Sequence, residues 1–276
     1  MGRALTFGFS PCPNDTFAFH ALVHGLVDSG GLTITPLLAD VEELNQRALA
    51  GELELSKLSF HALGYVLESY QLLRAGAALG RGCGPLLVAR PGFDLKRLGQ
   101  ARVAVPGRLT TAHLLLSMYL GRPPEVEPLQ FDQVMPAVAG GQYEAGLIIH
   151  EGRFTFQNYG LESLLDLGSW WEKETGRPIP LGCIAARRDL GPEAIARLER
   201  ALAASVAHAQ AHPLDSRAYV LAHAQEMQPQ VVAQHIGLYV NDFSRDLGGE
   251  GLAAVEELLA RGRASGLLPP ARVSLL

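Results

Sequence analysis

Residues 5–23 read LTFGFSPCPNDTFAFHALV, and this stretch joins two apolar segments through a polar turn. The apolar run at residues 5–9 predicts a short buried strand, and Pro11 and Pro13 stiffen the turn that follows it. Asn14 or Asp15 can then cap a helix that carries the second apolar segment. A strand, a turn and a helix in this order predict the first unit of an α/β domain.

The same alternation continues along the chain in two series. The first series is expected to contain strands at 32–37, 54–58 and 84–89, with helices starting near Asp40 and Ser59. The second is expected to contain strands at 103–105, 126–129 and 145–150, with helices from Thr110 and over 131–139. Strands that alternate with helices indicate parallel sheets with helices on their faces.

The last third of the chain predicts mainly helices. Gly, Pro and charged residues suggest a loop or crossing segment at 166–180, before a strand at 182–186. Helices are then expected at 192–211, 216–226, 229–239 and 251–265. The two series, joined by crossings near residues 90 and 180, predict a two-lobed, type II periplasmic-binding-protein-like α/β fold with mainly parallel sheets flanked by helices. We expect residues 1–90 and 187–276 in a larger lobe, residues 91–186 in a smaller lobe, and a ligand cleft between them.

The composition limits the classes of function. The chain of 276 residues has 23 basic and 28 acidic residues, and no basic cluster predicts a nucleic-acid or membrane-surface partner. Its three cysteines form no CxxC pair, so we expect reduced thiols and no structural zinc. No secretory signal or membrane-length apolar run is visible, which favours a cytoplasmic location. The oligomeric state cannot be read from the sequence.

Two polar segments of the first series are candidate ligand-binding sites. The segment at 10–16 includes Asn14 and Asp15 and precedes a helix whose free N–H groups can face an anion. A well-capped helix is the alternative. In the segment at 56–59, Ser56 and Ser59 can bind a carboxylate or cap a helix, and Lys57 can pair with an anion or lie in solvent.

Two further candidates lie in the second series. Thr110 and Thr111 follow a glycine turn at a helix start, where their hydroxyls and the helix dipole can hold a carboxylate. An ordinary threonine cap is the alternative. His150 closes an apolar strand, and imidazole can accept a proton near neutral pH. From the residues alone, a structural and a catalytic role for His150 are equally supported.

We expect no metal or organic cofactor. His20 and His24 have a spacing that can bind metal, but no HExxH pattern or acidic third ligand accompanies them. Cys12 near a helix start has no assigned base, so a thiol nucleophile is not favoured. The other histidines are interpreted as packing or surface residues. The predicted partner is therefore a small molecule that carries a carboxylate.

Six motifs resemble the 1,4-dihydroxy-6-naphthoate synthase family of the futalosine route to menaquinone, over about residues 5–260: SPCPNDTF, LSKLSFHALGY, GCGPLLVAR, PGRLTTAHLL, GLIIHEGRFTF and QHIGLYVNDFS. The resemblance implies a lyase without metal or cofactor that converts cyclic dehypoxanthinyl futalosine to 1,4-dihydroxy-6-naphthoate and dihydroxyacetone. It also implies that His150 is the base, and that the substrate-binding residues include Ser56, Lys57, Ser59, Thr110 and Thr111. Asn14, Asp15 and Asn45 are expected in the cleft by their position.

Three other functions remain open at this point. A chorismate-dehydratase-type lyase shares the fold, and a non-catalytic binding protein of the same fold would also hold a small carboxylate. An effector-binding regulatory domain would need a basic DNA-binding helix pair, and none is visible. Turnover of the naphthoate precursor, compared with chorismate, would separate these alternatives.

Overall fold

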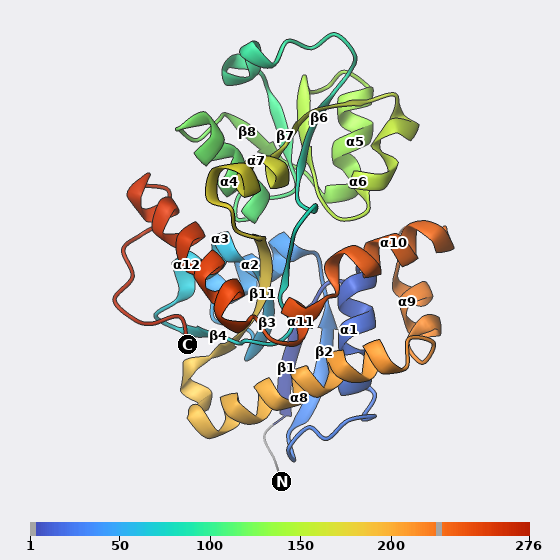
Figure 1. Ribbon diagram of the computed structural model, residues 1–276, viewed down its shortest axis with the longest axis vertical. Helices are drawn as coiled ribbons and strands as arrows, with labels where there is room; N and C mark the ends of the chain where they lie inside the picture. The colour runs from blue at the N-terminus through green and yellow to red at the C-terminus, as the bar shows by residue number, and fades with distance from the viewer. Residues whose placement is uncertain (1–3, 225–227) are drawn as a thin grey trace.

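The computed structural model describes residues 4–224 and 228–276, and it shows two lobes, one above the other (Figure 1). The larger, lower lobe contains a sheet with the order β2-β1-β3-β11-β4, and β5 also pairs with β11. Its strands are β1 (Ala4–Phe9), β2 (Thr33–Leu38), β3 (Leu55–Ser59), β4 (Tyr70–Leu72), β5 (Ala78–Gly80) and β11 (Ile179–Arg187).

The smaller, upper lobe contains a second sheet with the order β10-β6-β9-β7-β8. Its strands are β6 (Leu86–Ala89), β7 (Val103–Val105), β8 (Val126–Pro128), β9 (Ala145–Ile148) and β10 (Glu162–Asp166). The βαβαβ unit expected at 103–150 is confirmed, because β7 pairs in parallel with both β8 and β9.

The sheets are mixed, and the expectation of mainly parallel sheets is wrong. In the larger lobe β1 runs parallel to β2 and β3, but β11 runs antiparallel to β3, β4 and β5. In the smaller lobe β6 runs antiparallel to β9 and β10. Both β6 and β11 are strands that enter one lobe from the other. They begin at the cleft, where the parallel strands end, so they run in the opposite direction.

The two crossings lie earlier in the chain than expected. Residues 86–89 were assigned to the larger lobe, but β6 pairs with β9 and β10 of the smaller one. Residues 179–186 were assigned to the smaller lobe, but β11 pairs with β3 of the larger one. Both strands are apolar apart from Arg187 at the end of β11, and hydropathy alone cannot show to which sheet such a strand belongs.

The helices cover the sheets and connect the lobes. In the larger lobe α1 packs against α8, α9 and α10, and Figure 1 shows α8 crossing in front of β1 and β2. The helices in chain order are α1 (Pro13–Val23), α2 (Val41–Leu49), α3 (Phe60–Val66), α4 (Thr111–Leu120), α5 (Phe131–Ala139), α6 (Gly152–Thr155), α7 (Leu167–Thr175), α8 (Pro192–Ala211), α9 (Arg217–His223), α10 (Pro229–Tyr239), α11 (Asp242–Arg245) and α12 (Gly248–Ala264). Short 3₁₀ turns also lie at Leu95–Gln100, Phe156–Tyr159 and Arg188–Leu190. The predicted helix end at residue 226 lies outside the described residues.

The segment expected to be a loop at 166–180 contains helix α7 and the start of β11. Asp166 caps the helix by accepting a hydrogen bond from the Ser169 N–H at 3.0 Å, and Gly176 ends it with a left-handed φ of 68°. Trp171 is fully buried and donates its indole N–H to the Pro178 carbonyl at 3.1 Å. The glycine and proline residues, which suggested a loop, instead mark the two ends of this short helix.

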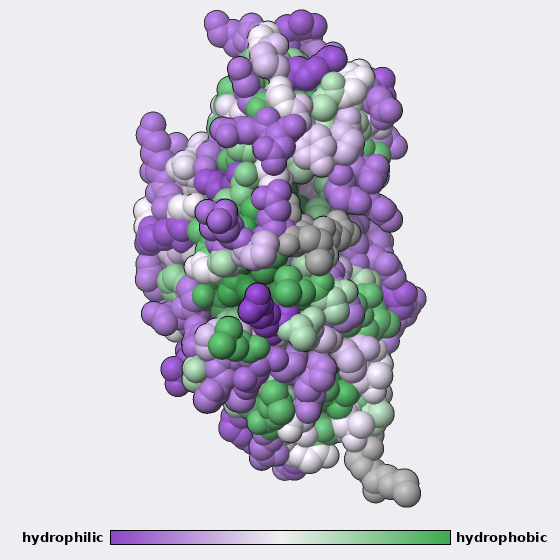
Figure 2. Space-filling model, turned by 90° about the vertical axis from the view of Figure 1, so that its right-hand side faces the viewer, coloured by the Kyte–Doolittle hydropathy of each residue, from purple (hydrophilic) through white to green (hydrophobic). Residues whose placement is uncertain are grey.

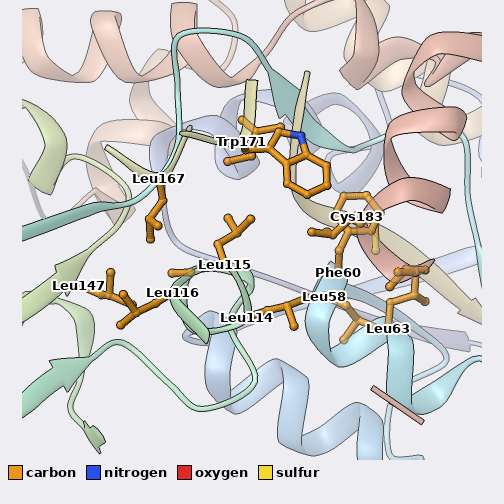
Figure 3. Close-up of a cluster of buried hydrophobic side chains, with 14 of the residues drawn as sticks. Leu58, Phe60, Leu63, Leu114, Leu115, Leu116, Leu147, Leu167, Trp171 and Cys183 are labelled. Carbon is orange, nitrogen blue, oxygen red and sulfur yellow. The ribbon is translucent and has the colours of Figure 1, made fainter. Parts of the chain in front are cut away.

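One hydrophobic cluster joins the lobes on the side of α4 and α7. Figure 3 shows Leu114, Leu115 and Leu116 of α4 between Leu147 on one side and Leu58 on the other. Trp171 lies in the same cluster (Figure 3). The lobes therefore share a core rather than meeting only through two connecting strands.

The surface is mixed in character. Figure 2 shows that hydrophilic residues cover much of the smaller lobe on this face, while hydrophobic residues gather near the middle of the molecule. Among residues 4–224 and 228–276, no helix is both long enough and apolar enough to cross a membrane.

Candidate active site

A cleft lies between the lobes, where the parallel strands β1, β3, β7 and β9 end. Its volume of about 80 Å³ has room for several water molecules. Its walls come from both lobes: Ser10, Asn14, Asp15, Val41, Lys57, Ser59, Ala78, Gly84, Pro85, Thr110, Thr111, Ala112, Ile149, His150, Leu181, Gly182 and Tyr239. Seven of the nine predicted site residues line this cleft, since only Ser56 and Asn45 are missing from its wall.

His150 lies two residues beyond the end of β9. The sequence had predicted that it closes the strand. Its φ of 55° makes it the one non-glycine residue with a left-handed backbone in the described part of the chain. Such a conformation costs energy and is common at functional sites. Burial lowers the pKa of His150 to about 4, with a smaller opposing effect from Asp15. The imidazole is therefore neutral at pH 7 and able to accept a proton.

The surroundings of the His150 ring are mostly apolar or aromatic. The Phe131 ring makes an edge contact with it, with 5.0 Å between the ring centroids. The His235 ring stacks on it, with 6.1 Å between the centroids and an angle of 14° between the ring planes. The His150 Nε2 atom is buried and makes no hydrogen bond. Burial removes the hydrogen bonds that this nitrogen would make with water, and a hydrogen bond with a substrate can replace them.

Asp15 connects the polar residues of the larger lobe. Its carboxylate accepts hydrogen bonds from the Ser10 N–H at 3.2 Å, the Ser10 hydroxyl at 2.7 Å and the Asn14 amide at 2.8 Å. The Lys57 ammonium lies 2.8 Å from the same carboxylate, and both side chains are almost fully buried. Lys57 is thus paired inside the cleft wall and is not a solvated surface lysine.

Strand β3 presents its alternate residues to the cleft. Lys57 and Ser59 face it, whereas Ser56 points to the other side of the sheet and donates its hydroxyl to the Lys57 carbonyl at 3.0 Å. Asn45 lies behind Ser59, because its amide oxygen accepts from the Ser59 N–H at 2.9 Å. The structure therefore does not place Ser56 in contact with a ligand, and it places Asn45 one layer behind the wall.

Thr110 and Thr111 begin helix α4 as expected, but their hydroxyl protons are already used. Thr110 donates to the Gly107 carbonyl at 2.8 Å, and Thr111 donates to the Leu181 carbonyl at 2.6 Å. The Thr110 hydroxyl also accepts from the His113 N–H, which is the helix cap. A carboxylate that receives hydrogen bonds from these hydroxyls requires a local rearrangement.

A carboxylate of the protein itself occupies the loop before α4. Both carboxylate oxygens of Glu42, on α2 of the larger lobe, lie within 3.2 Å of the Leu109 N–H of the smaller lobe. Burial raises the pKa of Glu42. Gly107 has a φ of 154°, which residues with a side chain rarely adopt, and a Cβ there would also clash with the Glu42 side chain unless that side chain moved. Glu42 thus links the two lobes at the predicted anion site.

Sequence reasoning missed two residues near His150. His235 was expected to be a surface or interhelical residue; it is interhelical, fully buried between α10 and α1, and it contacts Asn14 of the cleft wall. Tyr239, one turn later on α10, lines the cleft, and burial raises its pKa. Their four-residue spacing in QHIGLYVNDFS, one of the quoted motifs, is the signal that could have paired them on one helix face.

The described residues contain no group of three or more His, Cys, Asp or Glu side chains arranged to hold a metal ion. The polar side chains of the cleft comprise the paired Lys57 and Asp15, several hydroxyls, one amide and one imidazole, and such groups can bind an organic ligand.

A family model described as menaquinone biosynthesis matches residues 5–264. The chain belongs to this family. A 1,4-dihydroxy-6-naphthoate synthase from Thermus thermophilus is 53% identical over 268 residues, covering 97% of each chain. A protein of the same name from Streptomyces coelicolor is 50% identical over 270 residues, covering 96% of this chain and 95% of its own.

Solved structures of other proteins have the same fold as this chain. A crystal structure from Archaeoglobus fulgidus has a TM-score of 0.89 and 35% identity, and it covers 96% of this chain and 98% of its own. A Candida albicans protein described as having the generic periplasmic binding protein fold has a TM-score of 0.70 at 12% identity, covering 98% and 92%. The expected periplasmic-binding-protein-like α/β fold is confirmed.

Proposed function

We propose that this chain is a 1,4-dihydroxy-6-naphthoate synthase, a lyase that converts cyclic dehypoxanthinyl futalosine to 1,4-dihydroxy-6-naphthoate and dihydroxyacetone. The names of its two relatives support the product. The observation that carries the chemical assignment is the imidazole of His150 in the wall of the cleft between the lobes, where its buried Nε2 makes no hydrogen bond. The three buried, free cysteines are consistent with a reducing cytoplasm.

His150 acts as the base in this proposal. Its unpartnered Nε2 takes a proton from a carbon of the cyclised sugar, and the electron pair opens the ring by elimination. Aromatisation of the remaining rings drives loss of the three-carbon fragment, to which the proton is returned. The step needs no external oxidant or reductant. The positive charge that forms on His150 is stabilised by Asp15, whose carboxylate favours the protonated imidazole.

The substrate carboxylate binds at the start of α4 in this proposal. The helix dipole and the N–H groups near Thr110 and Thr111 favour an anion there, and Glu42 already occupies the adjacent Leu109 N–H with a carboxylate. The walls of the cleft come from both lobes, so in this proposal the lobes open for entry and close over the substrate. Lys57, Asn14 and Ser59 then face the hydroxyls derived from the ribose.

The test is turnover of the cyclic precursor by purified protein, with His150→Asn as the variant. Asparagine tolerates the left-handed backbone at this position, so the fold should be kept. We expect kcat to fall by about 10²–10⁴-fold, the usual contribution of a positioned base. His223→Asn, at an exposed histidine on α9, is the matched control and should retain full activity.

The outcomes separate the alternatives. Naphthoate formation by the wild-type protein supports the synthase, and full turnover by His150→Asn would contradict the assignment of the base. Binding of the precursor without product would indicate a non-catalytic binding protein. Product from chorismate, and none from the cyclic precursor, would indicate the dehydratase-type reaction.

A further inference from the structure

Tyr239 of α10 is a residue of the cleft wall that the mechanism above does not use. Its side chain lines the cleft and is 8% exposed. Within residues 4–224 and 228–276 its hydroxyl makes no hydrogen bond, although a buried tyrosine hydroxyl usually has a partner. The hydroxyl oxygen is also not sealed in the core, unlike the unpartnered ring nitrogens of His150 and His235. It is therefore accessible to a ligand in the cleft.

The other hydroxyls of the cleft wall already take part in hydrogen bonds. Ser10 donates to a carboxylate at 2.7 Å, and Thr110 and Thr111 donate to backbone carbonyls at 2.8 Å and 2.6 Å. The Ser59 hydroxyl accepts from a side-chain amide at 3.2 Å. Tyr239 differs from these residues, because its hydroxyl can turn to a ligand without giving up a hydrogen bond inside the protein.

Tyr239 lies close to the proposed base, because both side chains pack against the same buried ring. The centroid of the His235 ring is 4.8 Å from that of Tyr239 and 6.1 Å from that of His150. Both residues also line the same cleft of about 80 Å³. Their free groups are complementary, since a neutral imidazole nitrogen accepts a proton and a phenol hydroxyl donates a hydrogen bond.

We propose that Tyr239 is a further catalytic residue, whose hydroxyl donates a hydrogen bond to the sugar oxygen that leaves when His150 takes up its proton. The inference rests on the proposed function and deepens it. In the elimination the C–H bond breaks and its proton goes to His150, while the electron pair forms a C=C bond and the C–O bond breaks. The hydrogen bond from Tyr239 stabilises the negative charge on the leaving oxygen until His150 returns the proton.

Tyr239 keeps its own proton throughout this step. A phenol has an ordinary pKa of about 10, and burial raises the pKa of Tyr239 further. The residue is therefore a neutral hydrogen-bond donor at the pH at which His150 is a neutral base. A fixed donor of this kind stabilises a developing oxyanion without a second proton transfer.

Tyr239→Phe tests the proposal, because it removes the hydroxyl and keeps the ring. We expect kcat to fall by about 10²-fold or more and KM to change by less than about threefold, since the hydrogen bond strengthens as charge develops. Tyr70→Phe is the matched control. It removes a buried hydroxyl that donates to the Leu53 carbonyl at 2.7 Å and is not part of the cleft wall, so kcat should be unchanged.

The turnover results separate this inference from the function on which it rests. No conversion of the cyclic precursor by wild type would contradict the proposed function itself. An active wild type together with a Tyr239→Phe variant that keeps full kcat would contradict only the assignment of Tyr239.

Unfolding in denaturant tests the free hydroxyl without substrate. Tyr70→Phe loses an internal hydrogen bond, so its unfolding midpoint should be lower than that of wild type. Tyr239→Phe loses none and should keep the wild-type midpoint. Equal losses in the two variants would show that the Tyr239 hydroxyl has a partner inside the protein, and this result would overturn the proposal.

Discussion

At the scale of single residues, the backbone of His150 combines strain with burial. A left-handed φ of 55° lies outside the strand conformation, and the short turn after β9 places the imidazole in the cleft wall. The ring packs against Phe131 and His235 and its Nε2 is buried, so its neutral form is favoured. Burial of this kind makes the base available at pH 7 and also makes the folded state sensitive to acid.

The first prediction concerns stability against pH. The pKa of His150 is about 4 in the folded chain and 6.5 in its unperturbed form. Between these values the unfolded chain binds more protons, so the free energy of unfolding falls as the pH falls from about 6.5 to 4. The contribution of His150 is on the order of 3 kcal/mol. Denaturant titrations across this window should show a smaller pH slope for His150→Asn than for wild type.

The control for this prediction is His223→Asn, because His223 is exposed on α9. Its pH slope should equal that of wild type. Equal slopes for wild type and His150→Asn would show that His150 is not buried in its neutral form, and the assignment of the base would lose its physical support.

At the scale of elements, helix α4 and the turn before it organise the smaller-lobe side of the cleft. The turn contains Gly107, whose φ of 154° permits the close approach of Glu42. The helix ends at Gly121, which has a left-handed φ of 68° and open space around it. Both positions have a backbone conformation that favours glycine, but only at Gly107 would an added Cβ also contact a neighbouring side chain.

The second prediction compares the two ends of α4. Gly107→Ala should displace Glu42 and the first turn of the helix, which raises KM for the carboxylate substrate and lowers stability by about 1–3 kcal/mol. Gly121→Ala should cost stability through its backbone alone, by about 1 kcal/mol, and should leave KM unchanged. Steady-state kinetics and denaturant unfolding of both variants check this. A similar KM in both variants would mean that the turn does not bind substrate.

At the scale of the whole molecule, the shared hydrophobic core limits how the lobes can move. The cluster that contains Leu58, Leu115 and Trp171 continues from one lobe to the other. On the cleft side, by contrast, the lobes meet through polar contacts such as Glu42 with Leu109 and Thr111 with Leu181. Polar contacts can exchange with water or substrate, whereas a buried apolar contact that opens loses its hydrophobic free energy. Opening should therefore hinge about the apolar side.

The third prediction concerns this apolar side. Trp171→Ala removes a fully buried ring and should lower the free energy of unfolding by about 3–5 kcal/mol. Trp170→Ala, at the neighbouring and only partly buried tryptophan, should cost clearly less. Denaturant midpoints of the two variants decide the outcome. Equal losses would show that the core between the lobes does not depend on Trp171.

Much of the site was visible in the sequence because each segment of it is local. Asn14, Thr110 and His150 each follow a strand, Lys57 lies near the end of β3, and strand ends of this fold meet at the cleft. Ser56 was wrongly predicted to face the ligand, because successive side chains of a strand point to opposite faces of the sheet and an error of one residue reverses the assignment. His235 was missed because its contact with Asn14 spans 221 residues.

The sequence by itself determined the strand–helix alternation of the two series, the two-lobed α/β class and the family, because hydrophobic periodicity, helix caps and specific motifs depend on residues that are close in the chain. Only the tertiary structure decided which sheet receives β6 and β11, which threonine hydroxyls already donate to backbone carbonyls, and that His235 contacts Asn14. These facts depend on contacts between residues far apart in the chain. Such contacts are set by packing and by the pairing of buried donors with acceptors, and neither leaves a periodic signal in the sequence.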